Sequence, residues 1–98
     1  MIRPNIAARS AIEAYGDYEQ RQIAVEELAE LIVALKHYER HRVGIDAVVE
    51  EVADVIIVLA QLVAMFGEEA IEAKVAEKSE RLMLQIKLVS TVKKSLNE

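Results

Sequence analysis

The segment VVEEVADVIIVLA, residues 48–60, joins an almost unbroken apolar run to three acidic residues. Beyond Asp54 the run is so apolar that a helix formed by it must be buried on nearly every side. Glu50, Glu51 and Asp54 come just before that run, and carboxylates are rarely buried unless something pairs with them. The segment therefore predicts a core helix whose first turns carry acids that need a partner.

The composition is that of one small, strongly aliphatic domain covering residues 1–98. Apolar residues make up 53% of the chain, yet it has only three Tyr, one Phe and no Trp. A chain of this size buries only about two thirds of its unfolded surface. Hiding so much aliphatic surface favours association of several copies, and we expect a homodimer or a homotetramer.

Charge and residue usage exclude several classes of function. The net charge of −5 argues against a nucleic-acid-binding protein, and the absence of cysteine excludes disulfides and thiolate metal sites. The first ten residues lack the apolar core of a signal peptide. The longest apolar run, residues 55–66, is shorter than the roughly 20 residues that span a bilayer. We therefore expect a soluble, cytoplasmic protein without a membrane partner.

The spacing of apolar residues predicts helices throughout, and no segment shows the period of two that is typical of strands. The expected helices cover residues 5–15, 18–41, 47–66 and 68 to about 88, and residues 89–98 either extend the last helix or fray. The fold class is thus all-α, an antiparallel helical bundle that is completed by oligomerisation.

Glycine and aspartate mark the expected helix ends. Gly16 interrupts the chain, and Asp17 and Asp46 are expected to cap the helices that follow them. Gly44 and Gly67 are expected to end the helices that precede them.

Two acids three residues apart interrupt the apolar row of each of the two central helices. They are Glu27 and Glu30 on one helix, and Glu51 and Asp54 on the next. Residues at this spacing share a helix face, so two antiparallel helices would bring the pairs together at about the same level. Four converging carboxylates repel one another unless a divalent cation binds, and oxygen ligands alone suit Mg²⁺ or Mn²⁺.

Two alternatives to this metal site remain open at the level of sequence. Glu26 or Glu50 could be the inward-facing residue in place of its neighbour. The acids could also lie on solvated helix faces, where Glu is common.

The motifs EELAE at 26–30 and EEVAD at 50–54 resemble those of the MazG-like superfamily, the all-α nucleoside triphosphate pyrophosphohydrolases. That superfamily is marked by ExxE on one helix and ExxD on the next, and KVAEKSER at 74–81 is similar to its basic segment. The resemblance implies a hydrolase that uses Mg²⁺ to convert a (d)NTP into a (d)NMP and pyrophosphate, with a role in nucleotide-pool house-cleaning.

The resemblance also implies a role for each group of residues. The expected metal ligands are Glu27, Glu30, Glu51 and Asp54, and the expected phosphate-binding residues are Lys74, Lys78 and Arg81. Glu26 and Glu50 are the candidates for a catalytic general base, or else they support the ligands. The basic residues could instead form a solvated face that pairs with Glu77 and Glu80.

The chain differs from the superfamily at the positions that contact the nucleotide base. Ser79 stands where many relatives have Asn, and the tryptophans that line the base pocket of some relatives have no counterpart. Base-binding residues are therefore not identified, and the candidates are Tyr15, Tyr18, Tyr38, Phe66, Gln22 or a partner chain.

Three other functions compete with this interpretation. A phosphoribosyl-ATP pyrophosphatase has similar acidic motifs, and a non-catalytic helical oligomerisation module would explain the aliphatic excess. A di-iron bundle needs Glu-x-x-His pairs. Neither His37 nor His41 has a Glu three residues before it, so this last class is disfavoured.

Overall fold

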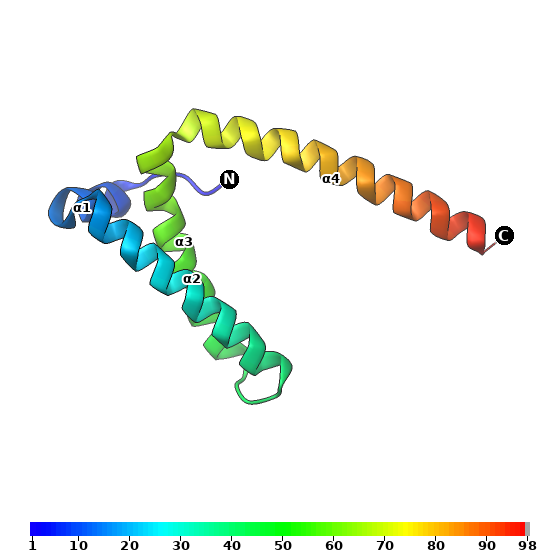
Figure 1. Ribbon diagram of the computed structural model, residues 1–98, viewed down its shortest axis with the longest axis horizontal. Helices are drawn as coiled ribbons and strands as arrows, with labels where there is room; N and C mark the ends of the chain where they lie inside the picture. The colour runs from blue at the N-terminus through cyan, green and yellow to red at the C-terminus, as the bar shows by residue number, and fades with distance from the viewer. Residues whose placement is uncertain (98) are drawn as a thin grey trace. The chain divides into compact units, whose positions relative to one another are not determined.

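The computed structural model describes residues 1–97, and within them it is all-α with four helices (Figure 1). They are α1 (Ile6–Tyr15), α2 (Asp17–Glu39), α3 (Ile45–Phe66) and α4 (Glu68–Leu96). The all-α prediction is confirmed. The last helix continues well past residue 88, so the described part of the tail extends it rather than fraying.

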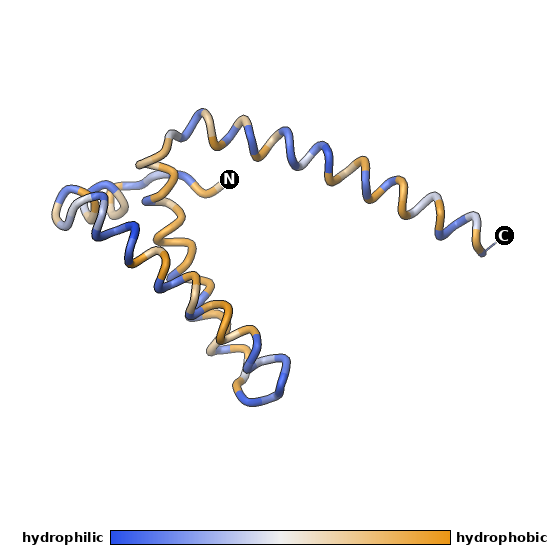
Figure 2. Tube along the Cα trace, in the orientation of Figure 1, coloured by the Kyte–Doolittle hydropathy of each residue, from blue (hydrophilic) through white to orange (hydrophobic). Residues whose placement is uncertain are grey.

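The chain divides into two units, residues 1–68 and the remainder, and each is described by itself. In the first unit α2 and α3 pack along each other as a helical hairpin, and α1 packs on both. Its buried residues are mostly small: Ala8, Ala24, Ala34, Val55, Val58, Ala60 and Val63, with the polar Gln20 and Gln61. Figure 2 shows how continuous the apolar run of α3 is.

The helix ends follow the predicted punctuation only in part. Gly67 ends α3 as expected, where its N–H donates to the carbonyl of Val63 at 3.1 Å. Asp17 and Asp46, however, are not N-caps. Gly16 and Gly44 occupy those positions without a side-chain hydrogen bond, and both acids lie inside the first turn. There they still favour the helix, because a negative charge stabilises the positive end of the helix dipole.

The turn between α2 and α3 also differs from the expectation. Gly44 does not end α2, because the helix stops at Glu39 and Arg40 is its C-cap. His41 then takes a left-handed backbone conformation with φ of 59°. Local backbone geometry at His41 thus reverses the chain, and Gly44 instead begins α3.

Gly16 adopts a conformation that other residues rarely take, with φ of 90° and ψ of 156°. It joins α1 to α2 directly, since it is the C-cap of one and the N-cap of the other. We expect Gly16→Ala to lower the free energy of unfolding by about 1–3 kcal/mol, because alanine is strained at this positive φ. A steric clash would not contribute, since a new Cβ at this position would contact nothing.

Urea denaturation measures this effect, and Gly44→Ala is the matched control. Gly44 is also an N-cap with open space around a new Cβ, but its φ is −90°. The control should change the free energy of unfolding by less than about 1 kcal/mol. Equal losses in the two variants would show that strain at Gly16 is not the cause.

The second unit consists of α4 from residue 69 onward. Taken by itself it is a long helix with no buried residue, and the Thr91 hydroxyl donates to the carbonyl of Lys87 within it. No helix in residues 1–97 is both long and apolar enough to cross a membrane.

Candidate metal centre

The acid pairs of α2 and α3 meet between the two helices. Each of Glu27, Glu30, Glu51 and Asp54 offers one carboxylate oxygen, and these four oxygens all lie within 4.8 Å of one another. We call these residues the carboxylate cluster. Because the ExxE and ExxD spacings put each pair on one helix face, the packing of α2 on α3 is enough to bring the four together.

The structure also decides which of two adjacent glutamates faces inward on each helix. Glu27 and Glu51 contribute to the cluster and are partly buried, whereas Glu26 and Glu50 are exposed. The two other members, Glu30 and Asp54, are exposed at the edge of the cluster. The cluster therefore opens to solvent on one side and is closed by the helix pair on the other.

Two carboxylate oxygens on the closed side have no hydrogen-bond partner among the described residues. They are Oε2 of Glu27 and Oε2 of Glu51, and both atoms are almost completely buried. Buried polar atoms in proteins nearly always have a hydrogen-bond partner or a bound ion, so two such oxygens without one require an explanation. A cation placed among the cluster oxygens would supply that partner for both atoms.

The electrostatics of the cluster point the same way. Burial raises the pKa of Glu27, and the charges of Glu30 and Asp54 raise it further. Burial likewise raises the pKa of Glu51, again with contributions from Glu30 and Asp54. The ionised forms of these two carboxylates therefore reduce the stability of the folded chain, and a bound cation would offset this loss.

The size of the cluster fits one divalent cation. Oxygens on opposite sides of a Mg²⁺ ion lie about 4.2 Å apart, because each Mg–O distance is about 2.1 Å. The cluster oxygens, all within 4.8 Å of one another, need only small side-chain adjustments to reach that spacing. With no sulfur or imidazole in the set, hard ions such as Mg²⁺ and Mn²⁺ are preferred.

A pocket of about 390 Å³ adjoins the cluster and shares Glu30 and Glu51 with it. Its walls are mainly apolar: Ala29, Val33, Ala34, Val43 and Ala47, together with Glu30, His37, Glu50 and Glu51. The volume lies within the range of small-molecule sites in proteins. The aromatic residues and Gln22 that the sequence offered for base contacts do not line it, whereas His37 does.

The pocket could not be found from the sequence because its residues look like ordinary helix surface. Ala29, Val33 and His37 follow one another at steps of four along α2. That row becomes a wall only because Val43, in the turn between the helices, and Ala47 of α3 also line the pocket.

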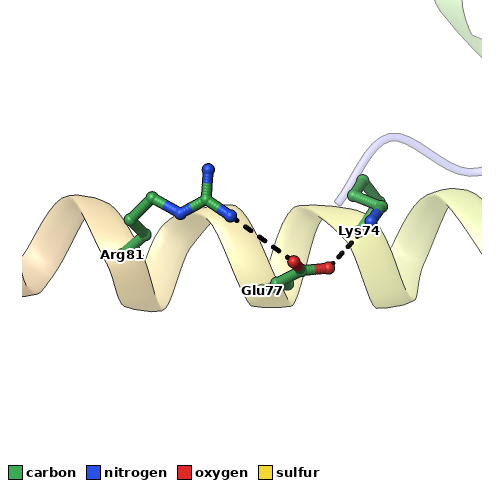
Figure 3. A network of polar contacts seen from close by, with 3 residues as sticks. All are labelled: Lys74, Glu77 and Arg81. Carbon is green, nitrogen blue, oxygen red and sulfur yellow. Dashed lines mark hydrogen bonds and ion pairs between the residues drawn. The ribbon is translucent and has the colours of Figure 1, made fainter.

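A different set of contacts surrounds the basic residues of α4 (Figure 3). Nζ of Lys74 lies 2.9 Å from Oε2 of Glu77, and a guanidinium nitrogen of Arg81 lies 3.5 Å from Oε1 of the same glutamate. All three side chains are more than half exposed. This is the solvated ion-pair arrangement that the sequence offered as the alternative for these residues, and their binding of phosphate stays a prediction.

No protein family model matches this chain, and no curated protein or solved structure matches it either.

Proposed function

We propose that the chain is a Mg²⁺-dependent nucleoside triphosphate pyrophosphohydrolase, which converts a (d)NTP into a (d)NMP and pyrophosphate. The observation that carries this proposal is the carboxylate cluster with its two buried, unpartnered oxygens. An ion-pair or hydrogen-bond role would have left those oxygens with protein partners. Carboxylates that lay only on a solvated helix face would not have buried oxygens.

The reaction adds one water molecule across the anhydride between the α- and β-phosphates. The four cluster carboxylates would hold Mg²⁺, which when bound supplies positive charge that polarises phosphoryl oxygens. Their own negative charge, four units on neighbouring atoms, otherwise repels a triphosphate. The same cluster thus becomes a substrate site only together with its cation.

Glu50 is the better placed of the two candidate general bases. It lines the pocket beside Glu51, and its charge contributes to the raised pKa of that neighbour. From there its carboxylate can accept the proton that water loses, either directly or through one further water. Glu26 is exposed on α2 and does not line this pocket, so we assign it second place.

The apolar pocket would hold the nucleoside part of the substrate. Its walls suit a flat, weakly polar base, while the shared Glu30 and Glu51 keep the phosphates near the cluster. His37 is the one wall residue with ring nitrogens, and it can exchange a hydrogen bond with a base edge. Our candidates to balance the phosphate charge remain the basic residues Lys74, Lys78 and Arg81 of α4. On binding phosphate, Lys74 and Arg81 would give up their contacts with Glu77.

Filling the pocket should separate base binding from metal binding. Ala29 is an exposed pocket residue, so Ala29→Phe adds bulk there without disturbing the buried core. We expect KM for the best nucleotide to rise by about tenfold or more, because the lost cavity space is worth a few kcal/mol of binding. The increase in melting temperature caused by Mg²⁺ should not change.

Steady-state kinetics and a thermal melt with Mg²⁺ measure the two quantities, and Ala53→Phe is the control. Ala53 is an exposed alanine of α3 that does not line the pocket. An unchanged KM in Ala29→Phe, or an equal increase in both variants, would place the base elsewhere.

The activity itself is tested by incubating the full chain with canonical and modified (d)NTPs in Mg²⁺, in Mn²⁺ and in EDTA. We expect pyrophosphate and the monophosphate in equal amounts, from one or a few of the nucleotides, and none in EDTA. Release of inorganic phosphate and a diphosphate would contradict cleavage between the α- and β-phosphates. Phosphoribosyl-ATP belongs in the panel, since its preferential turnover would favour the related pyrophosphatase.

We also propose that a second copy of the chain completes the bundle. Many aliphatic side chains of the α2–α3 hairpin are at least one-third exposed, among them Val25, Ile32, Val49 and Ile56. Large connected apolar patches are rare on monomeric proteins, and this number of exposed aliphatic side chains on one hairpin supports a partner.

A further inference from the structure

One row of residues on α2 has the spacing expected for contact with the same row in a second copy of the chain. The row runs Arg21, Val25, Leu28, Ile32, Leu35 and Glu39, at steps of four, three, four, three and four residues. This alternation is the spacing of a helix–helix seam, in which apolar side chains stay on the line of contact. We call these six residues the α2 seam.

The first unit by itself leaves the apolar members of the seam exposed. Val25 is 62% exposed, Ile32 61% and Leu35 44%, although the buried positions of the same helix, such as Ala24 and Ala34, are neighbours in sequence. The pocket residues Ala29 and Val33 follow a separate row of α2. A partner on the seam would therefore leave the pocket and the carboxylate cluster open.

The spacing of the seam is the same from either end, because its six positions are symmetric about position 30. If two copies of α2 cross antiparallel at that level, Leu28 of each meets Ile32 of the other, and Val25 meets Leu35. Such pairing is isologous, which is the commonest way in which two identical chains associate. A parallel arrangement, by contrast, would place Arg21 beside Arg21.

The charges at the two ends match the antiparallel arrangement. Arg21 begins the seam and Glu39 ends it, so the two-fold symmetry places each arginine opposite a glutamate of the other copy. Neither residue forms an ion pair within residues 1–97. The pairs would thus be available in the dimer at both ends of the contact, which is about 27 Å long.

The second helix of the hairpin adds apolar surface at the same level. The oxygens of Glu30 lie within 4.8 Å of those of Glu51 and Asp54, so position 30 is level with the second and third turns of α3. Val52 and Ile56 in that region are 39% and 47% exposed. Two hairpins joined through α2 would bring four helices around one axis, as in a four-helix bundle.

We infer that the α2 seam is the interface with a second copy of this chain, related by a two-fold axis at the level of Glu30. The inference does not depend on the proposed enzyme activity, because it uses the opposite set of side chains on α2. It commits to one register, in which Arg21 of each chain faces Glu39 of its partner.

Charge reversal at the seam ends tests the register. Arg21→Glu and Glu39→Arg each turn two attractive contacts per dimer into repulsive ones, and each should weaken the dimer about tenfold. Neither change should disfavour the α2 helix, since a base suits the helix end at Glu39, and Arg21 lies just beyond the first turn, where the dipole has little effect. The double variant Arg21→Glu/Glu39→Arg should dimerise within about threefold of the unmodified chain.

Mixing the two single variants gives the sharpest outcome. In the mixed dimer both end pairs are again of opposite charge, so heterodimers should form in clear excess over the half that random pairing gives. Sedimentation equilibrium measures the dissociation constants, and native mass spectrometry counts the mixed dimers. A monomeric chain, for example one in which α4 covers the seam, would overturn the inference, and so would random pairing of the two variants.

A substitution in the middle of the seam provides an independent test. Ile32→Asn should weaken the dimer by about a hundredfold or more, because two polar groups per dimer would be buried at its centre. Val33→Asn is the matched control, a neighbouring aliphatic residue of similar exposure on the pocket row, and should change dimerisation less than threefold. Circular dichroism checks that both variants are folded. Equal weakening by both variants would overturn the inference.

Discussion

Glu51→Gln is expected to reduce Mg²⁺-dependent pyrophosphate release by about 10²–10³-fold, because it removes a charged ligand from the carboxylate cluster. The amide keeps the size of the side chain but carries no negative charge. Combining it with Asp54→Asn should abolish measurable turnover, since only two charged ligands remain. Initial rates at saturating nucleotide and increasing Mg²⁺ measure the loss.

The matched control is Glu19→Gln, which also removes one carboxylate from α2–α3 but at an exposed position in the first turn of α2. It should leave the rate within about twofold of the unmodified chain. The metal-free Glu51→Gln protein should also be at least as stable as the unmodified chain, because the neutral amide relieves repulsion among buried like charges. A variant that is fully active with Mg²⁺ would remove Glu51 from the site.

The stability of the metal-free protein is expected to fall as the pH rises. The pKa values of Glu27 and Glu51 are raised in the folded state above their ordinary value of 4.5. A carboxyl group whose pKa is higher in the folded state favours folding in its protonated form. This contribution is complete below pH 4.5 and is lost as the pH rises through the raised values.

Magnesium is expected to reverse that loss. At a pH above the raised pKa values of Glu27 and Glu51, a free Mg²⁺ concentration about a hundredfold over its dissociation constant should raise the melting temperature by roughly 10–20 °C. Below pH 4.5 the increase should be much smaller, because Glu27 and Glu51 are then protonated and protonated carboxyl groups do not bind the ion. Thermal melts in EDTA and in Mg²⁺ across this pH range measure both effects.

The control for these melts is the double variant Glu27→Gln/Glu51→Gln. It removes the two groups with raised pKa, so its metal-free melting temperature should depend less on pH and respond little to Mg²⁺. A metal-free protein that becomes more stable between pH 4.5 and 7 relative to this variant would contradict the sign of the effect.

The same melts separate an enzyme from a non-catalytic helical module. A module would need the exposed aliphatic side chains, such as those of the α2 seam, but no cation. It would melt at the same temperature in EDTA and in Mg²⁺ at every pH. The buried oxygens of Glu27 and Glu51 would then lack an explanation in physical terms.

Much of the local structure could be predicted from the sequence because it depends on short-range chemistry. The apolar run after Asp54 predicts a helix that is buried on nearly every side, and this is confirmed only in part. Val55, Val58 and Val63 are buried, but Ile56 and Ile57 are 47% and 56% exposed. Gly67 ends that helix as expected. The caps at Asp17 and Asp46 were predicted wrongly, because an acid in the first turn and an acid at the N-cap look alike in sequence.

The candidate site could be predicted as far as helix periodicity reaches. The spacing of three places Glu27 with Glu30 and Glu51 with Asp54, and the structure brings these pairs together. Periodicity alone could not choose between Glu26 and Glu27, which differ by about 100° around the helix, because the choice depends on how α2 rotates against α3. The pocket depends on the same rotation, so it needed the structure.

Direct measurement of cation binding tests the central claim, that the carboxylate cluster holds a divalent ion. Electron paramagnetic resonance of Mn²⁺, titrated with the full chain without nucleotide, reports the free ion. We predict saturable binding that Mg²⁺ displaces and that Glu51→Gln/Asp54→Asn abolishes, while Glu19→Gln retains it. Mn²⁺ binding that is equal in the unmodified chain and in the double variant, or absent from both, would contradict the account.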